Sequence, residues 1–359
     1  MALPTLAASI RGVLDWRNIG LAHWPKYKSS IANTIATTTV TDVTPTPSPV
    51  FPGSNAFAGG VLLQDGRVFC VPRSFSPAYV YDPVTDIRTT SLAIFPTTSF
   101  FGGVLLQDGR VFCVPFASTN GYIYNPITDS ITIASGTYSS GNYRFAGGVL
   151  LPDGRVFCVP LVSSQATIYN PITDTTMTKD GLSDSIGGVL LPDGRVICIP
   201  YSTTGWIYNP ITNTGVALPH PSAGSYAFAG GVLLQDGRVF YVPGNSTSAR
   251  IYNPITNTLV TPTGTYPGND AFSGGILLPN GKVFLVPYNS TTARIYDPVT
   301  DTIATPSGTF PGSGAFSGGI LLRDGRVFCV PRNSTSARIY GGGGRFDQNV
   351  ALSAYYNKF

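Results

Sequence analysis

The chain has 359 residues, of which only 11% are charged, and its formal net charge is +4 at neutral pH. Gly and Pro are abundant, with 41 and 30 copies, while Glu, a strong helix former, is missing altogether. This composition favours an all-β chain with many turns. No run of Lys or Arg marks a nucleic-acid face, and no apolar stretch approaches the about 20 residues that span a bilayer. We therefore expect neither a nucleic-acid partner nor membrane insertion.

Residues 1–32 come first in the chain and lie outside the repeats that follow. This extension lacks the basic and apolar regions of a secretory signal, so we expect synthesis in a cytoplasm. It carries Trp16 and Trp24, two of only three tryptophans. Large aromatic side chains dominate interface energetics, so the extension is expected to anchor the chain to a partner. The alternative is that it folds back over the last repeat as a cap.

A repeat with a period of 40 to 45 residues fills most of the remaining chain. Its Gly-Gly pairs begin at Gly59, Gly102, Gly147, Gly187, Gly230, Gly274 and Gly318. This period, with several short strands in each copy, is typical of propeller blades. We predict an all-β, seven-bladed β-propeller over residues 33–340, with four-stranded antiparallel blades.

Each copy predicts four strands in the same order. In the fifth copy, two apolar runs flank Asp236 and Gly237, a strong hairpin signal that favours a type I′ turn. The third strand, "ARIYNPIT", ends in an Asn-Pro turn, and the fourth begins at Thr258. The first two strands are apolar throughout instead of alternating, which indicates that both of their faces are covered, as in stacked blades.

The last copy lacks a fourth strand, because Tyr340 is followed by four glycines. The stretch that begins "NTIATTTVTDVTP" at Asn33 resembles "NTLVTPTGTYP" in the fifth copy. We predict that residues 34–43 form the outer strand of blade seven and close the ring, which hides an exposed edge. Residues 341–359 are then a separate tail. Its aromatic residues are the second expected anchor: Tyr355, Tyr356 and Phe359.

The segment "LLPDGRVFCVP" followed by "YNPITDT" resembles the Kelch-like and galactose-oxidase-like propeller repeats. The resemblance implies the propeller fold for all seven copies. Galactose-oxidase relatives hold copper with histidines and tyrosines, and that ligand set does not carry over, since His23 precedes the ring and His220 is alone within it. Imidazole is the commonest copper ligand. We therefore expect no cofactor, no metal site, no catalytic residue and no enzymatic activity.

Two repeated features are expected to be structural. Five cysteines share a position that holds Tyr241 and Leu285 in the other two copies, so we predict buried free thiols at Cys70, Cys113, Cys158, Cys198 and Cys329. The hairpin tips pair an Asp or Asn with a basic residue two positions later, and we expect these charges to cancel. "NST" at Asn245, Asn289 and Asn333 is interpreted as polar loop rather than as a glycosylation acceptor.

One position that differs among the copies is a candidate binding site. It lies two residues before the repeated Tyr of the third strand and holds Tyr79, Tyr122, Thr167, Trp206, Arg250, Arg294 and Arg338. A sugar or an anionic polymer would stack on the aromatic residues and meet the guanidinium groups. The six aromatic and arginine residues are the candidate ligand-binding residues. The alternative is a half-exposed position that tolerates any large side chain.

The near-identity of the copies and their Ser/Thr/Gly/Asn-rich loops are similar in style to repeat proteins of tailed bacteriophages and environmental viruses. We therefore expect a non-enzymatic virion structural or adsorption protein, such as a capsid decoration or a tail or fibre component, assembled in the host cytoplasm and bound to other virion proteins through its extensions. The alternative is an extracellular glycan-binding module that recognises a host surface glycan. A galactose-oxidase-like enzyme ranks third.

Overall fold

The computed structural model describes residues 47–341, with the exception of residues 97–99, 139–142, 203 and 222–223. The chain divides into two units, residues 1–39 and 40–359, and all described residues belong to the second. Several predictions concern segments outside the described residues: the outer strand at 34–43, both terminal anchors and His23.

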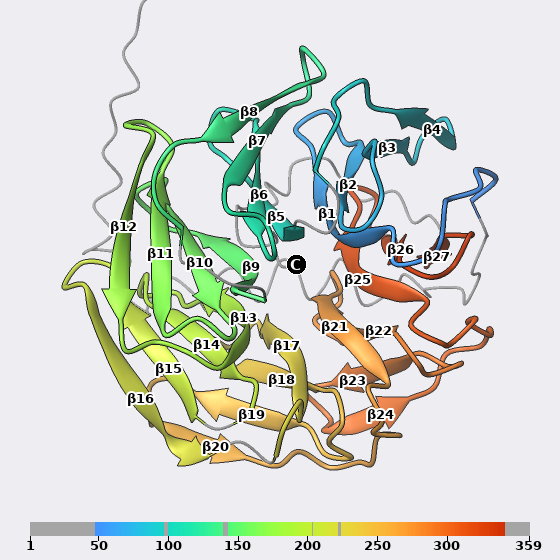
Figure 1. Cartoon of the computed structure of the whole chain (residues 1–359). Coiled ribbons are helices and arrows are strands. Elements are labelled where there is room, and N and C mark those ends of the chain that lie inside the picture. Colours follow the sequence, from blue (N-terminus) through green and yellow to red (C-terminus); the bar gives the residue numbers. More distant parts are fainter. Residues whose placement is uncertain (1–46, 97–99, 139–142, 203, 222–223, 342–359) are drawn as a thin grey trace, which may run out of the picture. The chain divides into compact units, whose positions relative to one another are not determined.

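Seven antiparallel sheets, here called blades one to seven in chain order, make up the described part of the chain (Figure 1). The innermost strands are β1 (Phe57–Leu62), β5 (Phe100–Leu105), β9 (Phe145–Leu150), β13 (Ser185–Leu190), β17 (Phe228–Leu233), β21 (Phe272–Leu277) and β25 (Phe316–Leu321). The second strands are β2 (Val68–Pro72), β6 (Val111–Pro115), β10 (Val156–Pro160), β14 (Val196–Pro200), β18 (Val239–Pro243), β22 (Val283–Pro287) and β26 (Val327–Pro331).

The outer strands vary more in length, and the fourth strands are more exposed than the inner strands. The third strands are β3 (Tyr79–Asp82), β7 (Gly121–Asn125), β11 (Gln165–Asn170), β15 (Thr204–Asn209), β19 (Arg250–Asn253), β23 (Arg294–Asp297) and β27 (Arg338–Tyr340). The fourth strands are β4 (Ile87–Thr90), β8 (Ser130–Ala134), β12 (Thr175–Asp180), β16 (Thr214–Pro221), β20 (Thr258–Val260) and β24 (Thr302–Ala304). Blade seven shows three strands among the described residues.

The innermost strands contact one another in chain order, and β25 contacts β1, so the blades form a closed ring (Figure 1). The predicted seven-bladed propeller is confirmed. Close approach of the innermost strands explains the second glycine of each Gly-Gly pair. A Cβ at Gly103 would lie 2.9 Å from Val61 Cγ2 and 3.0 Å from Val71 Cγ2, both in the preceding blade. The first glycine of each pair has positive φ, as at Gly59 (92°).

The hairpin between the first two strands differs from the predicted type I′ turn. In blade one, Gly66 has a positive φ of 93° whereas Asp65 does not. The Gly66 N–H donates to the Leu63 carbonyl oxygen at 3.0 Å, and the Leu63 N–H donates to the Arg67 carbonyl oxygen at 2.8 Å. This is a longer loop that ends in one left-handed glycine. The Asp65 carboxylate accepts the Arg67 N–H at 3.0 Å, which explains why Asp precedes the glycine.

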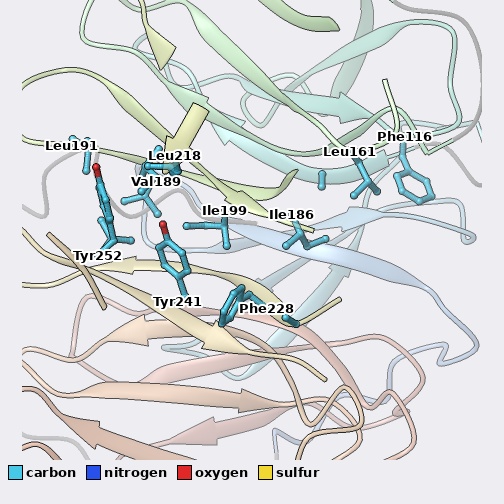
Figure 2. Packing of buried hydrophobic residues seen from close by; sticks show 14 residues of the cluster. Phe116, Leu161, Ile186, Val189, Leu191, Ile199, Leu218, Phe228, Tyr241 and Tyr252 are labelled. Carbon is cyan, nitrogen blue, oxygen red and sulfur yellow. The ribbon is translucent and has the colours of Figure 1, made fainter. Parts of the chain in front are cut away.

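Aromatic stacking joins neighbouring blades. The Phe of a second strand lies flat against the third-strand Tyr of the next blade, as in Phe69 and Tyr124, whose centroids are 4.3 Å apart at an interplanar angle of 15°. Equivalent pairs join most of the other blades. The Tyr124 hydroxyl then donates to Asp129 Oδ1 at 2.9 Å. At one interface Ile197 replaces this Phe. Figure 2 shows the cluster there, which includes Tyr252 and in which the rings of Tyr241 and Phe228 lie 5.3 Å apart between centroids.

The five cysteines are buried and free, as predicted. Each faces the third strand of its own blade, as in the pair Cys70 and Tyr79. Burial raises the pKa of the Cys70 thiol to about 12. The position is therefore a packing site between blades, which is why Tyr241 also fills it.

The chain before blade one lies against blade seven, as the closure prediction requires. Val50 forms an antiparallel bridge with Ser336, and the Phe51 N–H donates to the Thr335 carbonyl oxygen at 2.8 Å. The Phe310 N–H makes the same bond to Thr291 at 2.9 Å within the blade-six connection. Residues 48–51 therefore occupy, beside blade seven, the position that the segment between a fourth strand and the next innermost strand occupies beside the other blades.

Candidate functional site

The ring has two faces with different chemistry. Strand order places the loops between second and third strands on the same face as the connections into each innermost strand, here called the loop face. The hairpins and the third-to-fourth-strand turns lie on the opposite face, here called the turn face. Because adjacent strands are antiparallel in every blade, the same kind of connection lies on the same face in each of them.

The turn face carries Asp–Arg ion pairs at most of its hairpins. Arg67 Nη2 lies 2.7 Å from Asp65 Oδ2, and five other blades repeat the Asp–Arg ion pair. Arg326 also donates to the Pro83 carbonyl oxygen of the next blade at 3.2 Å. The expectation that these charges cancel is confirmed. The hairpin arginines are occupied in holding blades together.

The turn face also exposes a set of aliphatic side chains. Each third-to-fourth-strand turn has Ile or Val after its proline, and these side chains are 74% to 91% exposed: Val84, Ile127, Ile172, Ile211, Ile255 and Val299. The turn itself is held by the residue before the proline. The Asn125 Oδ1 atom, for example, accepts the Ile127 N–H at 2.9 Å. The aliphatic side chain therefore has no role in forming the turn.

The candidate residues from the sequence lie on the third strands. Tyr79 is buried against Phe57 and Phe75, with the Arg88 guanidinium carbon 4.1 Å from its ring centroid. Tyr122 and Trp206 are half-buried and pack against clusters between neighbouring blades. The three arginines are half-buried, and each donates from Nη1 to the carbonyl oxygen of the preceding residue: Arg250, Arg294 and Arg338.

These six side chains belong to six different blades. No hydrogen bond or ring contact joins any two of them within the part of the chain that the structure describes. The ring therefore spreads them around its circumference and does not gather them into one site. Ligand binding at these residues stays a prediction.

A different set of polar and aromatic side chains does come together, at the inner end of the loop face. The residue that follows each second strand is Arg73, Phe116, Leu161, Tyr201, Gly244, Tyr288 and Arg332 in blades one to seven. Backbone bonds across blades hold this position, as where the Ala56 N–H donates to the Arg332 carbonyl oxygen at 3.0 Å. Its side chains start near the innermost strands. The position varies in size, polarity and charge from blade to blade.

Arg73 lies against aromatic rings of the next blade. Its guanidinium carbon is 4.8 Å from the Phe116 centroid and 5.3 Å from the Phe101 centroid. Phe101 and Phe116 stack on each other at 5.2 Å, and Tyr143 of blade three meets Phe116 edge to face at 4.9 Å. Cation–π contacts of this kind hold a guanidinium in one orientation.

Arg332 lies on the other side of Arg73, in blade seven. Its Nε donates to Asn55 Oδ1 at 2.6 Å, and its Nη1 donates to the Tyr288 hydroxyl at 2.7 Å. Asn55 Nδ2 in turn donates to the Ser74 hydroxyl at 3.1 Å, beside Arg73. We call these residues the arginine–aromatic cluster: Asn55, Arg73, Phe101, Phe116, Tyr143, Tyr288 and Arg332.

The cluster concentrates positive charge. Burial, together with the nearby charge of Arg332, lowers the pKa of Arg73 to about 10. No ion pair joins Arg73 or Arg332 to a carboxylate among the described residues, whereas the hairpin arginines each have one. Asp270, in the connection into β21 on the same face, has a pKa raised by burial, so it favours its neutral form more than an exposed Asp does.

The sequence contains a signal for this cluster at a position other than the variable one on the third strands. The residue after each Val-Pro or Ile-Pro of the second strand differs in every pair of neighbouring copies, while the residues before it hardly change. Periodicity gives no indication that this position faces the inner end of the loop face, because it lies beyond the strand.

The "NST" asparagines connect the loops of neighbouring blades. Asn333 Oδ1 accepts the Asn55 N–H at 2.8 Å, and Asn289 Oδ1 accepts the Gly314 N–H at 2.9 Å. Asn245 accepts the Asp270 N–H in the same way at 2.9 Å. The asparagines thus order the loop face, consistent with the interpretation of these sites as structural loops.

No group of three or more His, Cys or Asp side chains among the described residues is arranged to hold a metal ion. His220 belongs to β16, the outermost strand of blade four. No helix in the described segments is long and apolar enough to cross a membrane.

Comparisons with known proteins identify the fold. A streptogramin B lyase matches 84% of this chain and 98% of its own length, with a TM-score of 0.69 at 12% identity. A catalytically inactive variant of the virginiamycin B lyase from Staphylococcus aureus, solved with quinupristin, matches 83% and 99%, with a TM-score of 0.70 at 9% identity. A fungal alcohol oxidase of the AA5 family, solved with copper, matches 82% and 76%, with a TM-score of 0.62 at 13% identity.

No protein-family model and no curated protein sequence matches this chain. The chain is a seven-bladed β-propeller, structurally similar to the virginiamycin B lyase and to the galactose-oxidase-like AA5 oxidase. Identities of 9% to 13% establish the shared fold and carry no reaction across to this chain.

Proposed function

We propose that this protein is a non-enzymatic display propeller: it attaches to an assembly and presents its loop face to a ligand. The observation that supports this most is the pattern of variation among the copies. Residues that build the blades repeat almost unchanged, whereas the position after each second strand runs from Gly244 through Leu161 to Arg73. Residues that are free to vary on a rigid ring are the usual place for binding specificity.

A place in a virus particle, as a capsid decoration or a tail or fibre component, is the setting that we propose. The support is the similarity in repeat style to tailed-bacteriophage and environmental-virus proteins. In this proposal, the exposed Ile and Val side chains of the turn face provide apolar contacts for particle proteins. In this arrangement the turn face and the terminal extensions bind particle proteins, and the loop face points outward.

The distribution of reactive groups supports binding over catalysis. The five thiols have no exposed surface, and burial raises the pKa of Cys70, Cys198 and Cys329 to about 12. A thiol with so high a pKa is a poor nucleophile. The chain has no Glu, and its two His are far apart in sequence.

The test is to separate particles from soluble protein in the source material and to quantify this chain in each fraction by mass spectrometry. We expect it in the particle fraction at a fixed ratio to the major particle protein. Chains that lack residues 1–25 or 345–359 should leave the particle fraction while they keep the circular-dichroism spectrum of the ring. A chain found only in the soluble fraction would contradict the proposal.

A glycan-binding module is the second candidate function. The arginine–aromatic cluster favours it, because aromatic rings beside fixed hydrogen-bonding groups suit the apolar and polar faces of a sugar ring. Display and glycan binding are compatible, since an adsorption protein of a particle needs a ligand.

A further inference from the structure

The arginine–aromatic cluster holds two guanidinium groups near each other without an acidic partner. The guanidinium of Arg73 makes no hydrogen bond to any residue in the described part of the chain, while its backbone N–H donates to the Ala56 carbonyl oxygen at 2.8 Å. Arg332 uses Nε and Nη1 for Asn55 and Tyr288, while its Nη2 group makes no hydrogen bond to a described residue. Both side chains are half-buried. Half-buried charges of one sign are costly unless an opposite charge joins them.

The two arginines are held in place before any ligand arrives. The ring of Phe116 and the ring of Phe101 fix the guanidinium plane of Arg73, and Tyr288 and Asn55 fix that of Arg332. A guanidinium whose orientation is already fixed loses less side-chain entropy on binding than a free one. The paired carboxylates that fix the hairpin arginines are replaced here by neutral groups, which leave the positive charge uncompensated.

The geometry points to a binding site for the carboxylate of an acidic sugar at the arginine–aromatic cluster, with Arg73 and Arg332 as the anion-binding residues. A carboxylate between them accepts charge-assisted hydrogen bonds from both guanidinium groups, which are stronger than neutral hydrogen bonds. The setting, a displayed loop face that meets a glycan, rests on the proposed function.

The groups around the arginines favour a sugar as the carrier of the carboxylate. The Tyr288 hydroxyl and the Asn55 amide provide hydrogen-bonding groups for sugar hydroxyls. Tyr143 is 54% exposed beside Phe116 and offers an aromatic ring to the C–H groups of a pyranose. A simple anion such as acetate would contact the arginines alone. A sugar acid would also place its ring against the aromatic residues of the cluster.

The test uses ligand-observed saturation-transfer NMR on the full-length protein with glucuronate, glucose and acetate. Glucose lacks the carboxylate and acetate lacks the ring. The variants are Arg73→Gln and Arg332→Gln, each checked for the circular-dichroism spectrum of the ring. Arg73→Lys, which keeps the charge, is the second variant in case Arg73→Gln fails to fold. The matched controls are Arg250→Gln, a half-buried arginine on a third strand, and Trp206→Ala.

We expect glucuronate to bind at least about tenfold more tightly than glucose or acetate. Each Gln variant should weaken glucuronate binding by about tenfold or more, as loss of a charge-assisted bond does, while Arg250→Gln and Trp206→Ala change it less than about twofold. Equal binding of glucuronate and glucose, or no binding of glucuronate at millimolar concentration, would overturn the inference. A larger effect of Trp206→Ala than of Arg73→Gln would move the site to the third strands and overturn it as well.

The outcome is separable from that of the proposed function. A chain that remains in the particle fraction without binding glucuronate would contradict only the sugar site. A chain that binds glucuronate through Arg73 and Arg332 but never enters the particle fraction would contradict only the display role.

Discussion

Replacing Phe51 by Ala tests whether the N-terminal chain closes the ring. Phe51 is 1% exposed and lies 6.3 to 6.5 Å, between ring centroids, from Phe57, Tyr79, Tyr81 and Phe328. It therefore joins blade seven to blade one. Removing a fully buried Phe costs about 3 to 5 kcal/mol of unfolding free energy through lost burial and the cavity left behind. In a protein of this size, that loss lowers the thermal midpoint by roughly 4 to 7 °C.

Phe310→Ala is the matched control, because Phe310 occupies the same place in the connection from blade six to blade seven and is 4% exposed. Thermal midpoints are measured by far-ultraviolet circular dichroism, which follows the unfolding of the β-sheets. We expect the two variants to lose stability by similar amounts. A loss below about 1 kcal/mol for Phe51→Ala, with the full loss for Phe310→Ala, would refute the closure of the ring by residues 48–51.

Three further predictions follow from the packing and the charges. Phe240→Ile should lower the unfolding free energy measured by denaturant titration by about 1 kcal/mol, because it removes the stack on Tyr296 at 4.8 Å. An unchanged free energy would show that stacking adds nothing. The five thiols should not react with Ellman's reagent until the ring unfolds, since all are buried; fast reaction of one native thiol would contradict its placement. Thr263 donates to Asp301 and holds the pKa of that carboxyl below its usual range. The stability that Asp301 contributes is therefore complete above the unfolded pKa near about 4 and is lost as the pH falls through the lower folded pKa. Asp301→Asn, which matches the natural Asn257, should reduce that loss in acid titrations followed by circular dichroism, and an identical acid profile would exclude this contribution.

The propeller could be predicted because the same local signals occur in every copy. Gly-Gly pairs, continuous apolar strands and Asn-Pro turns recur at one period, and each constrains the backbone for a physical reason. The type I′ turn was wrong because the Asp-Gly signal does not distinguish a two-residue loop from a longer one with a single left-handed glycine. In the structure Gly66 alone has positive φ, and Asp65 accepts backbone bonds instead.

The candidate site was harder to predict for a geometrical reason. Variation among the copies marks positions that are not needed for the fold, and both the third-strand position and the position after the second strand vary. The sequence does not show at which of these two positions the side chains of different blades come together in space. The third-strand residues are dispersed over separate blades, whereas Arg73, Phe116 and Arg332 are brought together by backbone bonds between blades. Such contacts depend on the curvature of the ring.

The most direct measurement is a crystal structure of the full-length protein soaked with glucuronate. It should show the carboxylate between the guanidinium groups of Arg73 and Arg332, with the sugar ring toward Phe116 and Tyr143. The sugar at Trp206 or Tyr122 instead, or an empty cluster at a glucuronate concentration well above the affinity measured in solution, would contradict the assignment of the arginine–aromatic cluster as the binding site.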